Sequence, residues 1–262
     1  MSLDSLPERV TVVEVGPRDG LQNESSQVGT ADKVRLIDLL TTAGLRAIEV
    51  TAFVNPRWVP QMADAAAVFA GITRVPGVRY TAIVPNLRGF ERAKAAGVSE
   101  VAVFPASSET FSRRNLNQSI EESFLAVAQV CRAAFDDGLP VRGYLSTAFG
   151  CPYEREVPLA RVVELAGRLM DLGVFEVALC DTIGVAHPGQ VARTVEQVAA
   201  RVPREKLALH FHDTRGMGLV NVLVGLQLGV ATFDASAGGL GGCPYAPGAS
   251  GNLATEDLIY ML

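Results

Sequence analysis

The chain has 262 residues, which fits one large α/β domain or two small ones, and 48% of them are hydrophobic, enough for a large core. A net charge of −5 argues against nucleic acid and anionic membranes as partners. The four widely spaced cysteines include no C-x-x-C pair, which predicts reduced thiols in a cytoplasmic protein. We see no signal-peptide pattern and no apolar run of the roughly 20 residues that span a membrane.

Short apolar strands and amphipathic helices alternate along the chain. The first strand is rich in β-branched residues and runs into the turn 16–20. A helix capped by Thr30 follows, ends at Gly44 and leads into a second strand. The same order then repeats. The predicted strands lie near 11–16, 45–51, 78–84, 99–104, 140–147, 174–180, 206–211 and 231–236.

Eight such units in about 250 residues predict a single-domain (β/α)8 TIM barrel over residues 1–262. An open doubly wound sheet is the alternative. Polar residues cluster just after the strands, and we favour the barrel because all its strand ends converge on one mouth. The last helical pattern, 253–262, is short. We therefore expect that a C-terminal helical part is absent from this chain, or that another subunit covers the final strand.

Two histidines end the seventh predicted strand. His210 and His212 are two residues apart, so they project from the same face of the strand and suit one metal ion. In an isolated H-x-H pair, both would more often be solvated side chains. Here Asp19 follows the first strand, and a barrel would bring it to the same mouth. Together the three offer mixed oxygen and nitrogen ligands to Mg²⁺, Mn²⁺, Co²⁺ or Zn²⁺.

Asp19, Arg18 and Gln22 all follow the first strand. Asp19 alone is compatible with a turn-stabilising role, and Arg18 alone with a solvated charge. A turn alone does not require all three of these residues, and in a barrel they would face the two histidines across the mouth. Glu49 ends an otherwise apolar strand and predicts an ion pair with an arginine of the interior, such as Arg18. Asp181 follows the sixth strand, where capping the next turn and joining the mouth are equally compatible with its position.

A glycine-rich stretch, 238–252, follows the eighth strand, where barrels often bind phosphate groups. The alternative is a plain flexible loop. Cys243 within it is predicted to be an exposed thiol. Asn252 at its end is either a helix N-cap or a fourth metal ligand.

Several long segments resemble the 3-hydroxy-3-methylglutaryl-CoA lyase family of metal-dependent TIM-barrel lyases. The resemblance covers essentially the whole chain. The matching segments are 13–24, 53–54, 58–62, 142–144, 150–154, 210–214 and the glycine-rich stretch through Asn252.

The resemblance implies cleavage of 3-hydroxy-3-methylglutaryl-CoA to acetyl-CoA and acetoacetate, with Mg²⁺ or Mn²⁺ as the cofactor. It implies that Asp19, His210, His212 and Asn252 bind the metal. Arg18 would stabilise the enolate of acetyl-CoA, and His210 and Asp19 would transfer protons. Glu49 and Gln22 would orient these groups, and Cys243 would close over the site. The expected partners are an acyl-CoA substrate and a second copy of the chain in a homodimer, without nucleic acid or membrane.

The chain departs from the family pattern at five positions, which are Ser25, Ala52, Ala178, Arg215 and Met217. These departures keep open a related 3-hydroxyacyl-CoA, such as citramalyl-CoA, as the substrate. Two further hypotheses are a Claisen-condensing synthase of the same superfamily and a non-catalytic barrel. The synthase is disfavoured because a C-terminal regulatory extension is absent from the sequence. The non-catalytic barrel is disfavoured because the charged residues of the mouth are all present.

Overall fold

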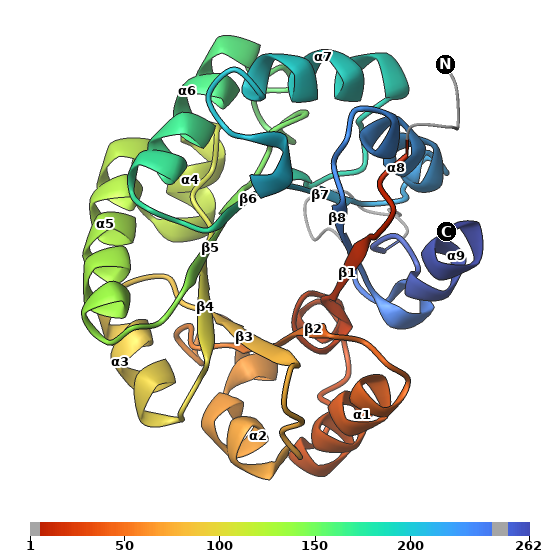
Figure 1. Ribbon diagram of the computed structural model, residues 1–262. Helices are drawn as coiled ribbons and strands as arrows, with labels where there is room; N and C mark the ends of the chain where they lie inside the picture. The colour runs from red at the N-terminus through yellow and green to blue at the C-terminus, as the bar shows by residue number, and fades with distance from the viewer. Residues whose placement is uncertain (1–5, 243–250) are drawn as a thin grey trace.

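The computed structural model describes residues 6–242 and 251–262. Within them, eight parallel strands pair in sequence order and close into a barrel, and helices form a ring around it (Figure 1). The predicted (β/α)8 barrel is therefore confirmed, and the open sheet is excluded. The strands are β1 Thr11–Glu14, β2 Ala47–Ala52, β3 Arg79–Ile83, β4 Glu100–Val103, β5 Val141–Leu145, β6 Glu176–Asp181, β7 Leu207–Phe211 and β8 Thr232–Ala235.

The strands are apolar because both of their faces are buried. Side chains that point outward pack against the helices in one continuous core, and those that point inward form a smaller cluster inside the barrel. Four alanines belong to this inner cluster, Ala52, Ala102, Ala178 and Ala208. Because these side chains are small, they leave space inside the barrel for larger side chains such as that of Arg142, which is fully buried.

The helices of the described ranges are α1 Thr30–Thr42, α2 Ala65–Gly71, α3 Leu87–Ala95, α4 Glu109–Leu116, α5 Ile120–Asp136, α6 Leu159–Asp171, α7 Pro188–Val198, α8 Gly218–Gln227 and α9 Thr255–Met261. The predicted capping box is present, since Ser119 and Glu122 exchange hydrogen bonds at the start of α5. Glycines with positive φ follow several helices, as at Gly44 (104°) and Gly173 (89°). Among the helices described, none is both long and apolar enough to cross a membrane.

The seam between β1 and β8 closes the barrel. The two strands pair from Thr11 with Thr232 to Glu14 with Ala235. The buried carboxylate of Glu14 accepts hydrogen bonds from the backbone N–H groups of Gly16 (2.8 Å) and Ala237 (2.9 Å) and from the Thr255 hydroxyl (2.7 Å). One side chain thus ties the first strand to the segment after the last strand and to α9.

Candidate metal centre and active site

The predicted site residues lie around a cavity of about 1420 Å³ at the carboxyl ends of the strands. Arg18, Asp19, Gln22, His210 and His212 all line it. The convergence that the sequence predicted is therefore present. The end of a barrel to which the strands point is where TIM-barrel enzymes carry their active sites.

A tight turn presents Arg18 and Asp19 to the cavity. Residues Gly16–Gly20 form a single π-helical turn in which the N–H groups of Arg18, Asp19 and Gly20 all donate to the Val15 carbonyl. Such turns are rare and are frequently found at functional sites. A Cβ atom on Gly20 would lie 2.9 Å from the Cβ of Leu240, so the close approach of the loop after β8 requires this glycine. Because of this turn, β1 ends at Glu14, earlier than the sequence predicted.

The end of β7 places the two histidines beside Asn252. His210 belongs to the strand, and His212 forms an antiparallel bridge with Asn252. The bridge is held by the N–H of Leu253, which donates to the Phe211 carbonyl at 3.1 Å, and by the N–H of Asp213, which donates to Gly251 at 3.1 Å. A residue predicted to lie at the end of a long loop is therefore fixed by backbone pairing.

Asp19, His210 and His212 have ligand atoms that all lie within 4.8 Å of one another. The Oδ2 atom of Asp19 lies 3.7 Å from Nε2 of His212 and accepts a 2.9 Å hydrogen bond from Nδ2 of Asn252. Oδ1 of Asn252 is buried and has no hydrogen-bond partner among the described residues. A buried orphan acceptor beside a carboxylate and two imidazoles fits a divalent cation with mixed oxygen and nitrogen ligands.

The protonation states of Asp19 and His212 also suit a cation. Burial alone would raise the pKa of Asp19, but the positive charge of Arg18 and then that of His210 hold this pKa well below its ordinary value. Burial, together with the neighbouring charge of His210, lowers the pKa of His212 to about 4. At neutral pH Asp19 is therefore an anion and His212 is neutral, which are the forms that bind metals.

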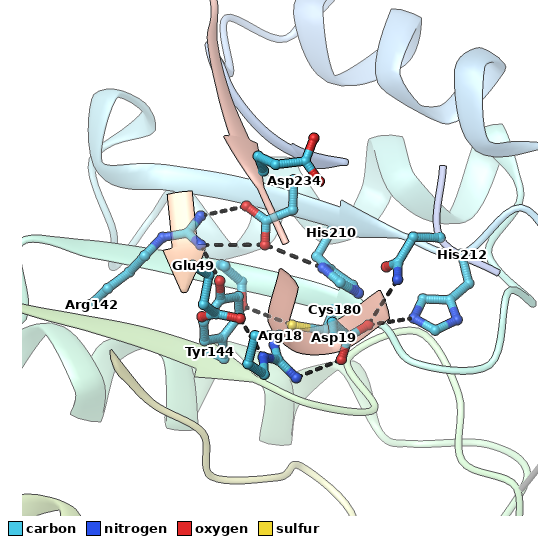
Figure 2. Close-up of polar contacts among 12 residues, drawn as sticks. Arg18, Asp19, Glu49, Arg142, Tyr144, Cys180, His210, His212 and Asp234 are labelled. Carbon is cyan, nitrogen blue, oxygen red and sulfur yellow. Dashed lines mark hydrogen bonds and ion pairs between the residues drawn. The ribbon is translucent and has the colours of Figure 1, made fainter. Parts of the chain in front are cut away.

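Arg18 is held between two carboxylates (Figure 2). Its Nε donates to Glu49 and its Nη1 donates to Asp19, so the predicted ion pair with Glu49 is present. Burial would lower the pKa of Arg18, but the charges of Glu49 and Asp19 together have the larger effect and raise this pKa above its ordinary value. The guanidinium is thus a permanent positive charge in a fixed position beside the metal cluster.

A second buried arginine, which the sequence analysis assigned no role, lies on the side of Asp234 that faces away from His210 (Figure 2). Arg142 of β5 pairs with Glu176 at 2.7 Å and with Asp234 of β8 at 2.8 Å, and Asp234 faces Nδ1 of His210 at 3.2 Å. Tyr144 accepts a hydrogen bond from the same arginine. The available signal was a charged residue within an apolar strand, at Arg142 and again at Asp234.

The ionic groups around the cluster leave an excess of negative charge. Four carboxylates, those of Asp19, Glu49, Glu176 and Asp234, face two guanidiniums, those of Arg18 and Arg142. When all four carboxylates are ionised and both histidines are neutral, the excess is two negative charges, which a divalent cation at the cluster would neutralise. His210 reaches its neutral form less readily than His212, because the hydrogen bond and charge of Asp234 raise its pKa against the effect of burial.

Neither Gln22 nor Asp181, two further predicted site residues, belongs to the Asp–His–His cluster. Gln22 lines the cavity. Both oxygens of Asp181 accept backbone N–H groups of the following turn, from Val185 and Ala186 at 2.9 Å, so this carboxylate has the turn-capping role that the sequence left open. Burial raises the pKa of Asp181 to about 6. Cys243 lies outside the described residues.

The outer part of the cavity is positively charged. Arg57, Arg88, Arg92 and Arg114 line it beyond the metal cluster, on the loops and helices after β2, β3 and β4. Among the described residues that line the cavity, Asp19 is the only carboxylate. In a chain with a net charge of −5, this local excess of arginine favours a polyanionic ligand.

A closed (β/α)8 barrel with an Asp–His–His cluster and a fixed arginine at its mouth defines a metal-dependent TIM-barrel enzyme. Residues 9–262 match the HMGL-like family, and the chain belongs to it. The resemblance noted from the sequence is thereby confirmed. So is the expected class of enzyme, a carbon–carbon lyase, because relatives named as such lyases match over the whole chain.

The chain is 56% identical to the mitochondrial hydroxymethylglutaryl-CoA lyase of Mus musculus, a match that covers 100% of this chain and 80% of the mouse protein. The crystal structure of hydroxymethylglutaryl-CoA lyase from Pseudomonas aeruginosa is similar with a TM-score of 0.96 and 54% identity, covering 98% of this chain and 86% of that one. An HMG-CoA lyase from Acinetobacter baumannii, in complex with coenzyme A and 3-methylmalate, is 41% identical with a TM-score of 0.93, covering 100% of this chain and 85% of that one.

Proposed function

We propose that the chain cleaves 3-hydroxy-3-methylglutaryl-CoA to acetyl-CoA and acetoacetate. The observation that carries this proposal is the cluster of Asp19, His210 and His212 beside Arg18 at the barrel mouth. Relatives that are more than 50% identical over the aligned residues carry the name of this activity. The reaction breaks a carbon–carbon bond next to a tertiary hydroxyl, which must lose its proton as the bond breaks.

Asp19, His210, His212 and Asn252 would hold the cation, with Mg²⁺ or Mn²⁺ as the expected ion. When bound, a divalent ion acidifies a substrate hydroxyl and polarises a carbonyl oxygen. The protein supplies the oxygen and nitrogen ligands, of which those of His210, His212 and Asn252 belong to buried residues. By resemblance to the family, Asp19 and His210 are also our candidates for proton transfer, and both belong to this cluster.

Arg18 would stabilise the negative charge that develops on the acetyl-CoA enolate. Its guanidinium is buried, permanently charged and held by Glu49 and Asp19, so it needs no reorganisation as the reaction proceeds. Electrostatic groups fixed before the reaction contribute most when charge appears only in the transition state. Glu49 acts here as the residue that positions Arg18.

The arginines of the outer cavity would bind the phosphates of coenzyme A. Arg57 and Arg88 are exposed at the mouth, whereas Arg92 is fixed by a hydrogen bond to the Val54 carbonyl (3.0 Å) and packs over the ring of Phe53. The complex of a relative with coenzyme A supports an acyl-CoA ligand. Arginine suits phosphates because its fork of N–H groups can donate two parallel hydrogen bonds.

Citramalyl-CoA is the second candidate substrate, because the family's serines are replaced by alanine at two positions. Ala52 and Ala178 are both buried in the apolar cluster inside the barrel, next to Ile83 and Cys180. Of these residues, Ile83 and Cys180 line the cavity. The two substrates differ by one CH₂ in the acid that is released, so the length of that acid is the property by which the site would distinguish them.

The substrate is tested by supplying each acyl-CoA with Mg²⁺ or Mn²⁺ and measuring the acid released, acetoacetate from the first and pyruvate from the second. We expect a higher kcat/KM for acetoacetate formation. A higher value for pyruvate would reassign the substrate and leave the reaction class intact. A homodimer and a cytoplasmic location belong to the same proposal, and relatives with this activity in their names are designated mitochondrial or cytoplasmic.

A further inference from the structure

Asp234 is a carboxylate in the middle of a barrel strand. It is 1% exposed, whereas its neighbours Phe233 and Ala235 are apolar and belong to the core. A carboxylate at such a position destabilises the fold unless it is paired. Its two oxygens are fully engaged. Oδ1 accepts from Nη2 of Arg142 at 2.8 Å, and Oδ2 accepts from Nη1 of Arg142 at 3.3 Å and faces Nδ1 of His210 at 3.2 Å.

We propose that Asp234 is a positioning residue that fixes His210 with its proton on Nδ1 and leaves Nε2 as the nitrogen available to the metal cluster. A carboxylate held by an arginine is only an acceptor, so the facing ring nitrogen must be the donor. The other nitrogen then carries the lone pair that a cation requires. This inference rests on the metal site in the proposed function.

The two histidines differ in the hydrogen-bond partner of their Nδ1 atoms. Nδ1 of His212 is buried without a hydrogen-bond partner among the described residues, whereas Nδ1 of His210 faces Asp234. Arg142 fixes the orientation of Asp234, and Arg142 is in turn held in place because its Nε donates to Glu176 at 2.7 Å. Figure 2 shows Arg142, Asp234 and His210 in contact in that order. Of the two histidines, His210 is thus the one that Asp234 and Arg142 connect to Glu176 inside the barrel.

The Asp234→Asn variant should reverse the polarity of this contact. Arg142 donates to both oxygens, so the amide oxygen will take the position of Oδ1, where the Arg142 hydrogen bond is shorter. The amide NH₂ then faces Nδ1 of His210 and donates to it. The proton of the imidazole must move to Nε2, which removes the lone pair from the metal cluster.

The test combines nitrogen NMR of His210 in metal-free protein, at a pH where the imidazole is neutral, with Mn²⁺ binding followed by electron paramagnetic resonance. Wild type should show the proton on Nδ1. Asp234→Asn should show it on Nε2, with Mn²⁺ affinity lower by about 10–100-fold. Glu176→Gln is the matched control, because it changes the same arginine on the side away from His210. Its tautomer should be that of wild type, and its Mn²⁺ affinity should stay within a few-fold.

A wild-type His210 with its proton on Nε2 would overturn the proposal even if no variant folds. Wild-type tautomer and affinity in Asp234→Asn would overturn it as well, and so would an equal loss of affinity in Glu176→Gln. A wild-type chain that binds no Mn²⁺ but carries the Nδ1 proton would contradict the metal site of the proposed function, while the positioning of His210 by Asp234 would stand.

Discussion

At the scale of single residues, the site depends on which charges are fixed and which are neutral. Asp19 stays ionised because Arg18 offsets the cost of its burial, and His212 stays neutral because burial and His210 oppose its protonation. One metal ligand is therefore anionic and one is neutral without any proton being removed at neutral pH. His210 differs, because the hydrogen bond and charge of Asp234 raise its pKa against the effect of burial, so a cation has to compete with a proton for this ring.

The His212→Ala variant tests this metal site directly. Replacing an outer neighbour of a metal ligand weakens binding by about 10–100-fold, so loss of a ligand should cost at least as much. Titration with Mn²⁺ measures the affinity. His187→Ala is the matched control, because His187 is exposed and lies outside the cluster. Equal affinities of the two variants would remove His212 from the site.

The Arg18→Gln variant tests the role of the fixed guanidinium. Loss of one fixed donor to a developing oxyanion lowers kcat by about 100–1000-fold, and we expect this range with a smaller change in KM. Arg88→Gln, at the exposed outer part of the cavity, should raise KM and change kcat little. Steady-state kinetics of both variants separate the roles. A near-normal kcat in Arg18→Gln would contradict the mechanism.

At the scale of elements, the turns that follow the strands place the chemistry. The π-helical turn Gly16–Gly20 presents Arg18 and Asp19, and the bridge between His212 and Asn252 brings the loop after β8 to the histidines. The turn after β6 has a structural role, since Asp181 caps it through two backbone N–H groups. Similar acidic residues after two strands thus serve different purposes.

The Asp181→Asn variant tests the structural role through pH. Burial raises the pKa of Asp181 from 3.8 to about 6, so the folded chain holds this proton more tightly than the unfolded chain. Its contribution to stability is largest below pH 4 and falls as pH rises to 6. Asparagine does not titrate, so the stability gap between wild type and variant should narrow over this range by roughly 1–3 kcal/mol. Urea unfolding at both pH values measures the gap, and one that stays constant or widens would contradict this account.

Much of the fold was predictable from local pattern. Strands buried on both faces appear as apolar runs, and glycines such as Gly44 and Gly173 mark helix ends because they adopt positive φ. His210, His212 and Asp19 were predictable because each follows or ends a strand. The roles of Asp234 and Arg142 were not predictable, because they depend on a contact between residues 92 positions apart, which no spacing in the sequence indicates.

At the scale of the whole molecule, closure of the barrel depends on contacts between the two ends of the chain. Glu14 of β1 accepts hydrogen bonds from Ala237 and Thr255, more than 220 positions away. The helix α9 that it holds carries exposed apolar side chains, Ile259 and Tyr260. The expected C-terminal helical part and the dimer contact at this seam remain predictions.

The Glu14→Ala variant tests this closure. It would leave the N–H groups of Gly16 and Ala237 and the hydroxyl of Thr255 without their acceptor, each at a cost of about 1–3 kcal/mol, so we expect a loss of about 3 kcal/mol or more. Glu8→Ala, at an exposed position near the same strand, should change stability by less than about 0.5 kcal/mol. The midpoints of urea unfolding compare the two. Equal midpoints would show that Glu14 does not hold the seam.

The most direct test of the central claim is the turnover of 3-hydroxy-3-methylglutaryl-CoA by chelator-treated protein, before and after addition of Mn²⁺. We predict that acetoacetate formation is absent after chelation and returns when about one ion per chain has bound. Formation of acetoacetate at an unchanged rate in the presence of the chelator would contradict the proposed metal-dependent mechanism. Its absence from folded, Mn²⁺-loaded protein would contradict the proposed substrate.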